Sequence, residues 1–304
     1  MGNRQPLYVP TMTQSPGSQA PKSQAPGSRA FVKMNGAGND FVVVNALDRP
    51  FTPTPGQVRA LANRQTGQGF DQLIAIEPSQ DGGDAFMRVW NADGGVVETC
   101  GNALRCVGWM LMQADGSDRV AIDTLGGPTV ASAAGDHQVK VDMGTPKLDW
   151  TEVPLAEAMD TRNIELQLGP IDAPILHTPG AVSMGNPHVV FFTDQAPTDA
   201  FVTANGSLIE HHPLFPEGVN VGFAHVVARD DIRLRVWERG AGLTRACGTG
   251  ACAALVACAR RGLTDRSARV EVDGGDLFIE WDEATDHVFM TGPVEVERTG
   301  VLDL

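Results

Sequence analysis

The sequence repeats itself once, and this repeat constrains the fold more than any other feature. Three blocks recur in the same order 147 residues further along the chain: Gly38-Asn39 as Gly185-Asn186, Arg88-Val89-Trp90 as Arg235-Val236-Trp237, and Cys100-Gly101 as Cys247-Gly248. Several blocks in one order at one spacing indicate a gene duplication. We therefore expect two similar α/β units related by a pseudo-twofold axis.

The local patterns of the two halves agree with each other. Segments rich in β-branched and aromatic residues, bounded by Gly, Pro and Asp, predict strands at 41–44, 72–76 and 86–90 and again at 188–192, 219–227 and 232–237. Each half has one convincing helix, residues 102–113 and 249–259, and both are apolar on nearly every face. Such helices are enclosed rather than laid on a surface. The predicted fold class is α/β (α+β), in two pseudo-symmetric domains that each form a curved sheet or barrel around a central helix.

Composition excludes several classes of function. The 304 residues include 37 acidic and 23 basic side chains, a net charge of −14 that repels nucleic acid and anionic membrane surfaces. No apolar run approaches the ~20 residues of a membrane span. The 5 cysteines have no C-x-x-C spacing and no flanking histidines, so neither a disulfide framework nor a structural metal site is predicted. A soluble, cytoplasmic protein is expected.

The N-terminal segment differs in composition from the rest. Residues 1–30 are rich in Pro, Ser, Gln and Gly, contain no acidic residue and offer little apolar surface. Burial of so little surface cannot offset the entropy lost on ordering. We expect residues 1–30 to form a disordered tail that is dispensable for folding.

The chemistry is expected where each enclosed helix begins. Cys100 and Cys247 stand at the predicted N-caps, where free backbone N–H groups and the positive end of the helix dipole converge. This environment stabilises a thiolate and lowers its pKa, and a substrate carboxylate can bind the same N–H groups. Cysteine is also a common buried space-filler. That interpretation suits Cys106, Cys252 and Cys258 inside the helices, whereas the paired polar, Gly-rich settings favour chemistry at the other two.

Two symmetry-related thiols suit the inversion of a carbon centre. A base on one face removes a proton and an acid on the opposite face returns one, and the roles exchange in the reverse reaction. Cysteine, with a reference pKa of about 8.5, can hold either form near neutral pH after a modest shift. Outside the tail the only lysines are Lys33, Lys140 and Lys147, none of them in a phosphate-binding loop. A pyridoxal cofactor needs a Schiff-base lysine, so a reaction without any cofactor is predicted.

These residues belong to a longer series of motifs that resembles the diaminopimelate epimerases. The series runs from about residue 31 to the C-terminus: 33–41 (KMNGAGNDF), 69–73 (GFDQL), 91–94 (NADG), 100–102 (CGN), 184–188 (MGNPH), 220–223 (NVGF), 238–242 (ERGAG) and 246–250 (ACGTG). The resemblance implies a pyridoxal-independent epimerase that interconverts LL- and meso-diaminopimelate. It also implies a small-molecule substrate, two pseudo-symmetric domains and a cytoplasmic homodimer.

Site residues follow from the resemblance position by position. Cys100 and Cys247 would be the acid/base thiols, and backbone at Gly101-Asn102 and Gly248-Thr249 would hold the carboxylate on the reacting carbon. The implied substrate contacts are Asn39, Gln72, Asn91, Asn186, Asn220, Glu238 and Arg239. An arginine can bind a distal carboxylate bidentately, and carboxylate and amide side chains suit an ammonium group. His188 and Glu238 are candidates for tuning the thiol pKa, although a lone histidine beside a strand is often structural.

The resemblance also sets the expected domain boundaries. Its last strand returns to the first domain, which gives an N-terminal domain of 31–145 plus 290–304 and a C-terminal domain of 146–289. Two positions depart from the pattern. Asn35 stands where histidine is frequent, and Ala103 stands where glycine is frequent, which adds a methyl group beside the carboxylate-binding turn.

Two other functions remain open from the residues. Proline and hydroxyproline racemases use the same two-thiol architecture on a ring with one carboxylate. A redox-sensing binding module could instead close its paired cysteines into a disulfide. The Glu238-Arg239 pair and the many amide side chains favour an open-chain substrate with two zwitterionic ends, because neither alternative explains them.

Overall fold

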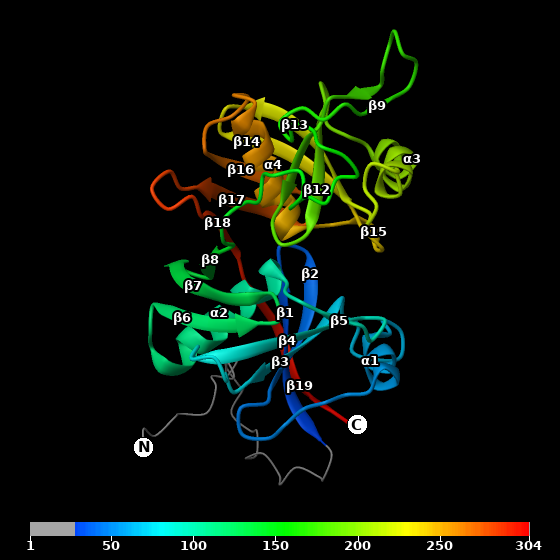
Figure 1. Cartoon of the computed structure of the whole chain (residues 1–304). Helices are drawn as coiled ribbons and strands as arrows, with labels where there is room; N and C mark the ends of the chain where they lie inside the picture. Colours follow the sequence, from blue (N-terminus) through cyan, green and yellow to red (C-terminus); the bar gives the residue numbers. More distant parts are fainter. Residues whose placement is uncertain (1–27, 304) are drawn as a thin grey trace. The chain divides into compact units, whose positions relative to one another are not determined.

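The computed structural model describes residues 28–303, which divide into two compact units (Figure 1). The first unit comprises the described chain up to Val139 together with the segment from Pro293 onward, and the second is Lys140–Gly292. Both mix helices with sheet, so the predicted α+β class is confirmed. Among the described residues no helix is long and apolar enough to cross a membrane.

The first unit is one mixed sheet with two helices. In chain order its elements are β1 (Arg29–Gly36), β2 (Asn39–Asn45), α1 (Pro55–Ala62), β3 (Gln72–Glu77), β4 (Ala85–Asn91), β5 (Val96–Val97), α2 (Gly101–Asp115), β6 (Arg119–Thr124), β7 (Gly127–Gly135) and, at the C-terminus, β19 (Glu295–Leu302). Strand β8 (Gln138–Asp142) begins in the first unit and ends in the second. Strands β2 and β3 are parallel, as are β4 and β6. The pairs β1–β19, β1–β2, β3–β4 and β6–β7 are antiparallel.

The second unit repeats this order of elements. A short hairpin of β9 (Gln167–Leu168) and β10 (Leu176–His177) precedes β11 (Gly180–Ser183), β12 (Pro187–Phe192), α3 (Asp199–Glu210), β13 (Asn220–Ala228), β14 (Asp231–Glu238), β15 (Gly242–Thr244), α4 (Gly248–Arg260), β16 (Ser267–Val272), β17 (Gly275–Trp281) and β18 (Val288–Pro293). The parallel pairs β12–β13 and β14–β16 match those of the first unit. The duplication read from the sequence is therefore present in the topology.

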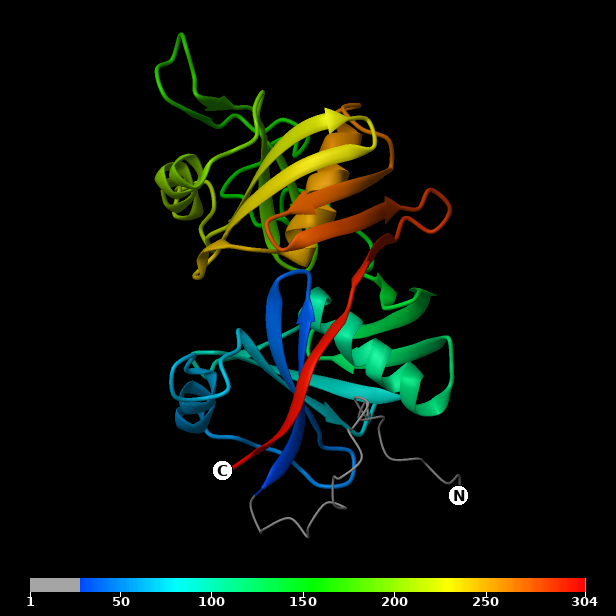
Figure 2. The same cartoon turned by 180° about the vertical axis from the view of Figure 1, so that it is seen from behind.

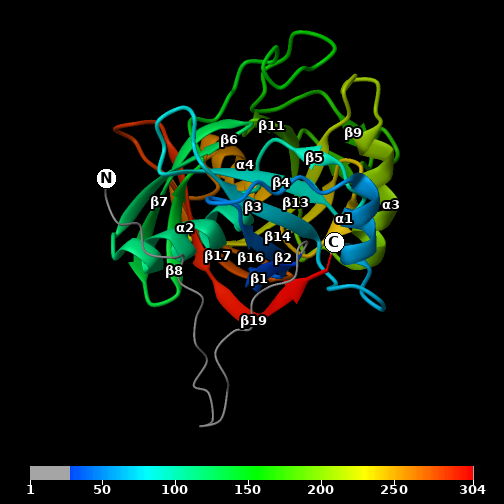
Figure 3. The same ribbon diagram turned by 90° about the horizontal axis from the view of Figure 1, so that it is seen from below.

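Each sheet is covered by a helix on both faces. In β2 the run Phe41 to Val44 is wholly buried, because its alternate side chains point to opposite covered faces. Val42 and Val44 pack with Val58 of α1, while α2 lies against β1, β2, β6 and β7 (Figure 3). In the second unit α4 contacts β11 to β14, β16 and β17, so strands surround much of its circumference (Figure 2). Closure of either sheet into a barrel stays a prediction.

The expected strands and the two enclosed helices are confirmed, but each unit contains a second helix that the patterns did not indicate. Helix α1 is short and opens with Pro55, and α3 covers the outer side of β13 to β15. A signal for α1 was available, since Thr54 accepts a hydrogen bond from Gln57 N and the Gln57 side chain accepts one from Thr54 N. This reciprocal pair is a capping box followed by proline at the first helical position.

The predicted tail is too long at its C-terminal end. Arg29 and Ala30 belong to β1 and pair with Leu302 and Val301 of β19, so disorder up to residue 30 is wrong for these two residues. The C-terminal strand supplies backbone partners that no local pattern near residue 30 could show. Residues 1–27 lie outside the described residues. The domain boundaries at residues 145 and 290 stay a prediction, since they concern independent folding.

Truncation at two positions tests the role of β1. Removal of residues 1–27 should leave the melting temperature nearly unchanged. Removal of residues 1–34 also deletes the buried side chains of Phe31, Val32 and Met34, each worth about 1.5–3 kcal/mol. We expect this longer truncation to lower the melting temperature by about 10 °C or more, or to prevent folding. Calorimetry of both variants measures this, and equal stability would show that β1 contributes little.

Candidate functional site

The predicted site residues fall into two sets, one on each unit. The first unit brings together Asn39, Gln72, Asn91 and the Cys100-Gly101-Asn102 turn. Gln72 opens β3 and is the register partner of Asn91 at the end of β4, and its Nε2 donates to Asn91 Oδ1 at 3.0 Å. Asn102 Nδ2 donates to Asn39 Oδ1 at 2.5 Å. One amide pair therefore joins the Cys100-Gly101-Asn102 turn to Asn39, and the other joins the adjoining ends of β3 and β4.

Cys100 is the N-cap of α2, as the sequence predicts. Its backbone is extended, at φ −145° and ψ 112°, and α2 begins at Gly101. The first N–H groups of a helix have no intrahelical partner and can bind an anion. Ala103, which stands where glycine is frequent, is fully buried, and α2 still begins at Gly101.

Charged residues that the sequence analysis missed support this half of the site. Arg105 is wholly buried inside α2, and its Nη1 donates to Asn102 Oδ1 at 2.9 Å, which orients the asparagine beside Cys100. A charged residue within an otherwise apolar helix was the available signal. Near Asn39, Arg64 bridges Asp40 and Asp71 at 2.6 and 2.7 Å. Burial opposes the charge of Asp40, but hydrogen bonds from Arg64 and Asn35 lower its pKa overall.

In the second unit Cys247 is the N-cap of α4, at φ −126° and ψ 108°. Its Sγ accepts a hydrogen bond from Gly250 N at 3.4 Å and lies 3.6 Å from Thr249 Oγ1. A Cβ at Gly250 would lie 3.2 Å from the sulfur and 3.0 Å from Val236, so glycine allows this close approach of the backbone. The side chain of Cys247 is buried, whereas that of Cys100 is partly exposed.

The expectation of a lowered thiol pKa is wrong for Cys247. Burial raises its pKa well above the ordinary value, and the nearby negative charge of Glu238 raises it further. The hydrogen bonds from Thr249 and Gly250 lower it, but they are the weaker influences. Glu238, at the end of β14, accepts from Thr244 Oγ1 at 2.5 Å and also interacts with the Cys247 side chain. The Glu238 pKa is itself raised, first by burial.

His188 reaches the same thiol through Thr249. It lies on β12, only 1% exposed, and its Nε2 is 2.9 Å from Asn186 Oδ1 and 3.1 Å from Thr249 Oγ1. Burial lowers the His188 pKa to about 3, helped by the positive charge of Arg239. The imidazole is therefore neutral at ordinary pH. It positions Thr249 beside the sulfur and adds no positive charge to stabilise a thiolate.

Asn220 and Glu210 hold the backbone that carries Arg239. Asn220 is buried at the start of β13, donates from Nδ2 to Pro187 O at 2.9 Å and accepts from Arg239 N at 2.9 Å. Glu210, at the end of α3, accepts from Gly240 N at 2.8 Å and from Trp237 Nε1 at 2.7 Å. Burial opposes the charge of Glu210, but these two hydrogen bonds lower its pKa. The exposed Arg239 guanidinium donates to Glu217 O at 2.9 Å.

The two halves are chemically unequal at one repeat-related position. Asn91 ends β4 and Glu238 ends β14, 147 residues apart. The neutral amide stands in the unit of Cys100, and the carboxylate stands in the unit of Cys247. Because a carboxylate opposes ionisation of a neighbouring thiol, this difference favours the protonated form of Cys247.

Comparisons with known proteins agree with this arrangement of residues. The family model described as diaminopimelate epimerase matches the chain twice, at residues 31–148 and 180–297. The chain belongs to the diaminopimelate epimerase family. Diaminopimelate epimerase from Caulobacter vibrioides (strain NA1000 / CB15N) is 62% identical over 280 residues, which span 90% of this chain and 97% of the relative. Diaminopimelate epimerase from Phenylobacterium zucineum (strain HLK1) is 59% identical over 274 residues, spanning 90% and 98%.

Solved structures show the same fold at lower sequence similarity. A hydroxyproline epimerase from Agrobacterium vitis, solved with bound trans-4-hydroxy-L-proline, superposes with a TM-score of 0.66 and covers 91% of each chain at 15% identity. At that identity the likeness concerns the fold. It confirms the two-domain, repeated architecture predicted from the sequence.

The dependence of the free energy of unfolding on pH, on the acid side, tests whether His188 is buried and neutral. Its folded-state pKa, about 3, lies below the ordinary value of 6.5, so the unfolded chain binds more protons between these values. Neutral His188 therefore contributes fully to the free energy of unfolding above pH 6.5. This contribution is lost as the pH falls towards 3, by up to ~1.4 kcal/mol per pH unit. His188→Gln should flatten this limb in urea melts across pH. An NMR signal of His188 that titrates between pH 5.5 and pH 7.5 would contradict this.

Proposed function

We propose that this chain is a diaminopimelate epimerase, interconverting the LL and meso isomers without a cofactor. One observation carries the proposal: each half of a family-matched repeat places a cysteine at the N-cap of an enclosed helix. Sequence identities of 62% and 59% over nearly the whole length of relatives bearing that name support the substrate assignment. The scarcity of lysine supports a pyridoxal-independent reaction.

The proposed chemistry is a proton transfer on each face of the α-carbon. In one direction Cys100, as the thiolate, removes the α-proton and becomes the thiol. Cys247, as the thiol, gives its proton to the opposite face and becomes the thiolate. The electron pair left by the first proton is consumed by the second, so charge and protons balance. In the reverse direction the two cysteines exchange roles.

Burial and the Glu238 carboxylate support Cys247 as the acid in the resting protein, because both raise its pKa. If Cys247 is protonated before the reaction, the base must be the other cysteine. We therefore propose that Cys100 acts as the base in the direction in which Cys247 acts as the acid.

The helix N-termini and polar side chains supply the proposed substrate contacts. The first-turn N–H groups at Gly101-Asn102 and Gly248-Thr249 would bind the α-carboxylate, and the negative charge that develops on it during proton removal would be stabilised there. Gln72 Oε1 is buried with no hydrogen-bond partner among the described residues, so an ammonium group of the ligand would satisfy it. The exposed Arg239 guanidinium would bind the distal carboxylate with two parallel hydrogen bonds.

A homodimer in the cytoplasm is part of the same proposal. The family resemblance supports it. The net charge of −14 also disfavours nucleic acid and anionic membrane surfaces as partners. The proline racemase alternative is less favoured, because the hydroxyproline epimerase structure shares 15% identity with this chain, whereas the diaminopimelate epimerase from Caulobacter vibrioides shares 62%.

Loss of either thiol should abolish epimerisation. Cys100→Ala and Cys247→Ala should each lower kcat by about 10²–10⁴-fold or more, since neither removal nor return of the proton can be omitted. The serine variants should retain only slight activity, because a hydroxyl is a far weaker base. The assay follows LL- to meso-diaminopimelate conversion by chiral chromatography, and L-proline should not be racemised.

Cys258→Ala is the matched control for these variants. Cys258 is buried within α4, and burial raises its pKa to about 12, so it should be inert. This variant should keep full kcat. Full activity in either the Cys100 or the Cys247 alanine variant would refute the assignment of the acid and base.

Glu210 should act as a positioning residue for Arg239. Glu210→Gln replaces one accepting oxygen with a donor and breaks either the Gly240 or the Trp237 hydrogen bond. We expect KM for diaminopimelate to rise about tenfold, which is ~1.4 kcal/mol, with a smaller change in kcat. Glu217→Gln is the control, because only the backbone of Glu217 contacts Arg239. An unchanged KM would show that the Glu210 contacts do not set the position of Arg239.

A further inference from the structure

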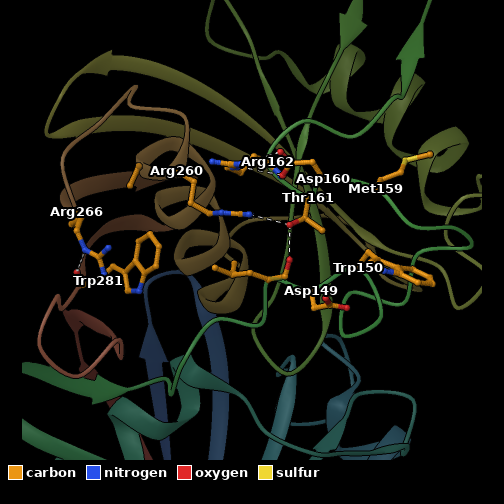
Figure 4. Close-up of a pocket in the computed structure, with 11 residues that line it drawn as sticks. Asp149, Trp150, Met159, Asp160, Thr161, Arg162, Arg260, Arg266 and Trp281 are labelled. Atoms are coloured by element: carbon orange, nitrogen blue, oxygen red, sulfur yellow. Dashed lines mark hydrogen bonds and ion pairs between the residues drawn. The ribbon is translucent and has the colours of Figure 1, made fainter.

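The second unit contains a pocket at the C-terminal end of α4, away from Cys247 at the other end of this helix. Its volume is about 540 Å³, within the range of small-molecule sites. The lining residues come from the segment before β9, the end of α4 and the β16–β17 region: Leu148, Asp149, Trp150, Met159, Asp160, Thr161, Arg162, Ala259, Arg260, Arg266 and Trp281 (Figure 4). Much of this lining belongs to residues 149–179, which lie between the two stretches matched by the family model.

Three guanidinium groups and two carboxylates line the pocket, and both carboxylates are already engaged. Arg162, Arg260 and Arg266 face Asp149 and Asp160. Asp160 accepts from Arg162 Nη2 at 3.2 Å, and Asp149 accepts from the backbone and hydroxyl of Thr151. Arg266 pairs in turn with Asp286 at 3.7 Å, so among these three arginines Arg260 is the one whose charge no ion pair of the described residues balances.

Arg260 is the half-buried guanidinium of this group. Its Nη2 donates to Thr161 Oγ1 at 3.0 Å and its Nη1 approaches Ala181 O at 3.4 Å. No carboxylate of the described residues forms an ion pair with it, and burial lowers its pKa. Arg235 differs in this respect, because hydrogen bonds from its guanidinium to Asp273 and Asp199 outweigh burial and raise its pKa.

Stabilisation of the C-terminus of α4 explains in part why an arginine stands at position 260. A cation in the last helical turn interacts favourably with the helix dipole. A guanidinium has five N–H donors in a planar fork, however, and carbonyl and hydroxyl acceptors use only some of them. In Figure 4 Arg260 lies between Trp281 and Trp150, with Arg162 on the side of Thr161. An anion on this fork would receive charge-assisted hydrogen bonds that the protein's own groups do not take.

We propose that this pocket binds a small organic anion, a carboxylate or phosphate with an aromatic or apolar body. The anionic group lies on Arg260 and Arg162, which match its planar or tetrahedral oxygens. The apolar body lies against the partly exposed side chains of Leu148, Trp150 and Met159. Helix α4 spans Gly248–Arg260, about 20 Å at 1.5 Å per residue, so the pocket is distinct from the groups around Cys247.

Ligand-observed NMR with three probes tests this site on the full chain. Benzoate, phenyl phosphate and the uncharged benzyl alcohol share one aromatic body. Benzoate and phenyl phosphate should show saturation transfer, with benzyl alcohol binding at least tenfold more weakly. A preference for one of the two anions identifies the head group. Absence of binding by both anions at 20 mM, on the order of the weakest affinities for single fragments, would overturn the proposal.

Matched arginine variants locate the binding. Arg260→Gln should weaken benzoate binding about tenfold or more, and Arg162→Gln, at an exposed side chain, should weaken it several-fold without affecting the fold. Arg229→Gln, whose guanidinium pairs with Asp265 elsewhere on the unit, should not change it. Arg239→Gln should not change it either. Binding lost in Arg239→Gln, or retained in both Arg260→Gln and Arg162→Gln, would place the anion elsewhere and refute the pocket.

Discussion

In both halves of the chain, the first turn of an enclosed helix stands beside one cysteine, and the other features of the site depend on this arrangement. The free N–H groups of that turn can bind a carboxylate. The ends of the surrounding strands supply the side chains that would hold the rest of the ligand. Strands β2 to β4 and β12 to β14 carry their terminal amide and charged side chains towards these starts. The parallel pairs have equivalent registers, since Phe41 pairs with Gln72 in the first unit and His188 pairs with Asn220 in the second. The polar site and the apolar core are thus products of one sheet geometry.

The repeat makes the halves alike in fold, and a few substitutions make them unlike in charge. Glu238 occupies the position that Asn91 holds in the first half, and it lies beside a buried thiol. Such inequality determines which of the two thiols holds the proton at rest, since two equivalent interacting thiols would share one proton between them. His188 adds a neutral hydrogen-bonding contact through Thr249 to the same side. The asymmetry is therefore concentrated around Cys247.

The sequence predicted the fold class, the main strands and both enclosed helices because those signals are local and periodic. Helices α1 and α3 were missed, since neither has the nearly continuous apolar sequence that marks the two enclosed helices. The Cys247 pKa was predicted in the wrong direction, because a helix N-terminus is visible in sequence but burial and the approach of Glu238 are not. Glu210 supports the backbone beside Arg239 through a contact between α3 and the turn after β14, so only the folded chain relates the two. Arg105 contacts Asn102 within α2, three residues away, and a charged residue in an otherwise apolar helix could have indicated this role. No motif in the sequence predicted the pocket at the C-terminal end of α4, beside Arg260.

Deuterium incorporation during turnover tests the two-thiol reaction most directly. In D₂O both thiols exchange their protons for deuterons, so the face that is protonated receives deuterium while the original hydrogen leaves on the other side. With LL-diaminopimelate as substrate, mass spectrometry at early times should find one deuterium at the inverted α-carbon of the meso product and none in the remaining LL isomer. Equal early labelling of both isomers, or a product that retains the original hydrogen, would mean that a single base serves both faces.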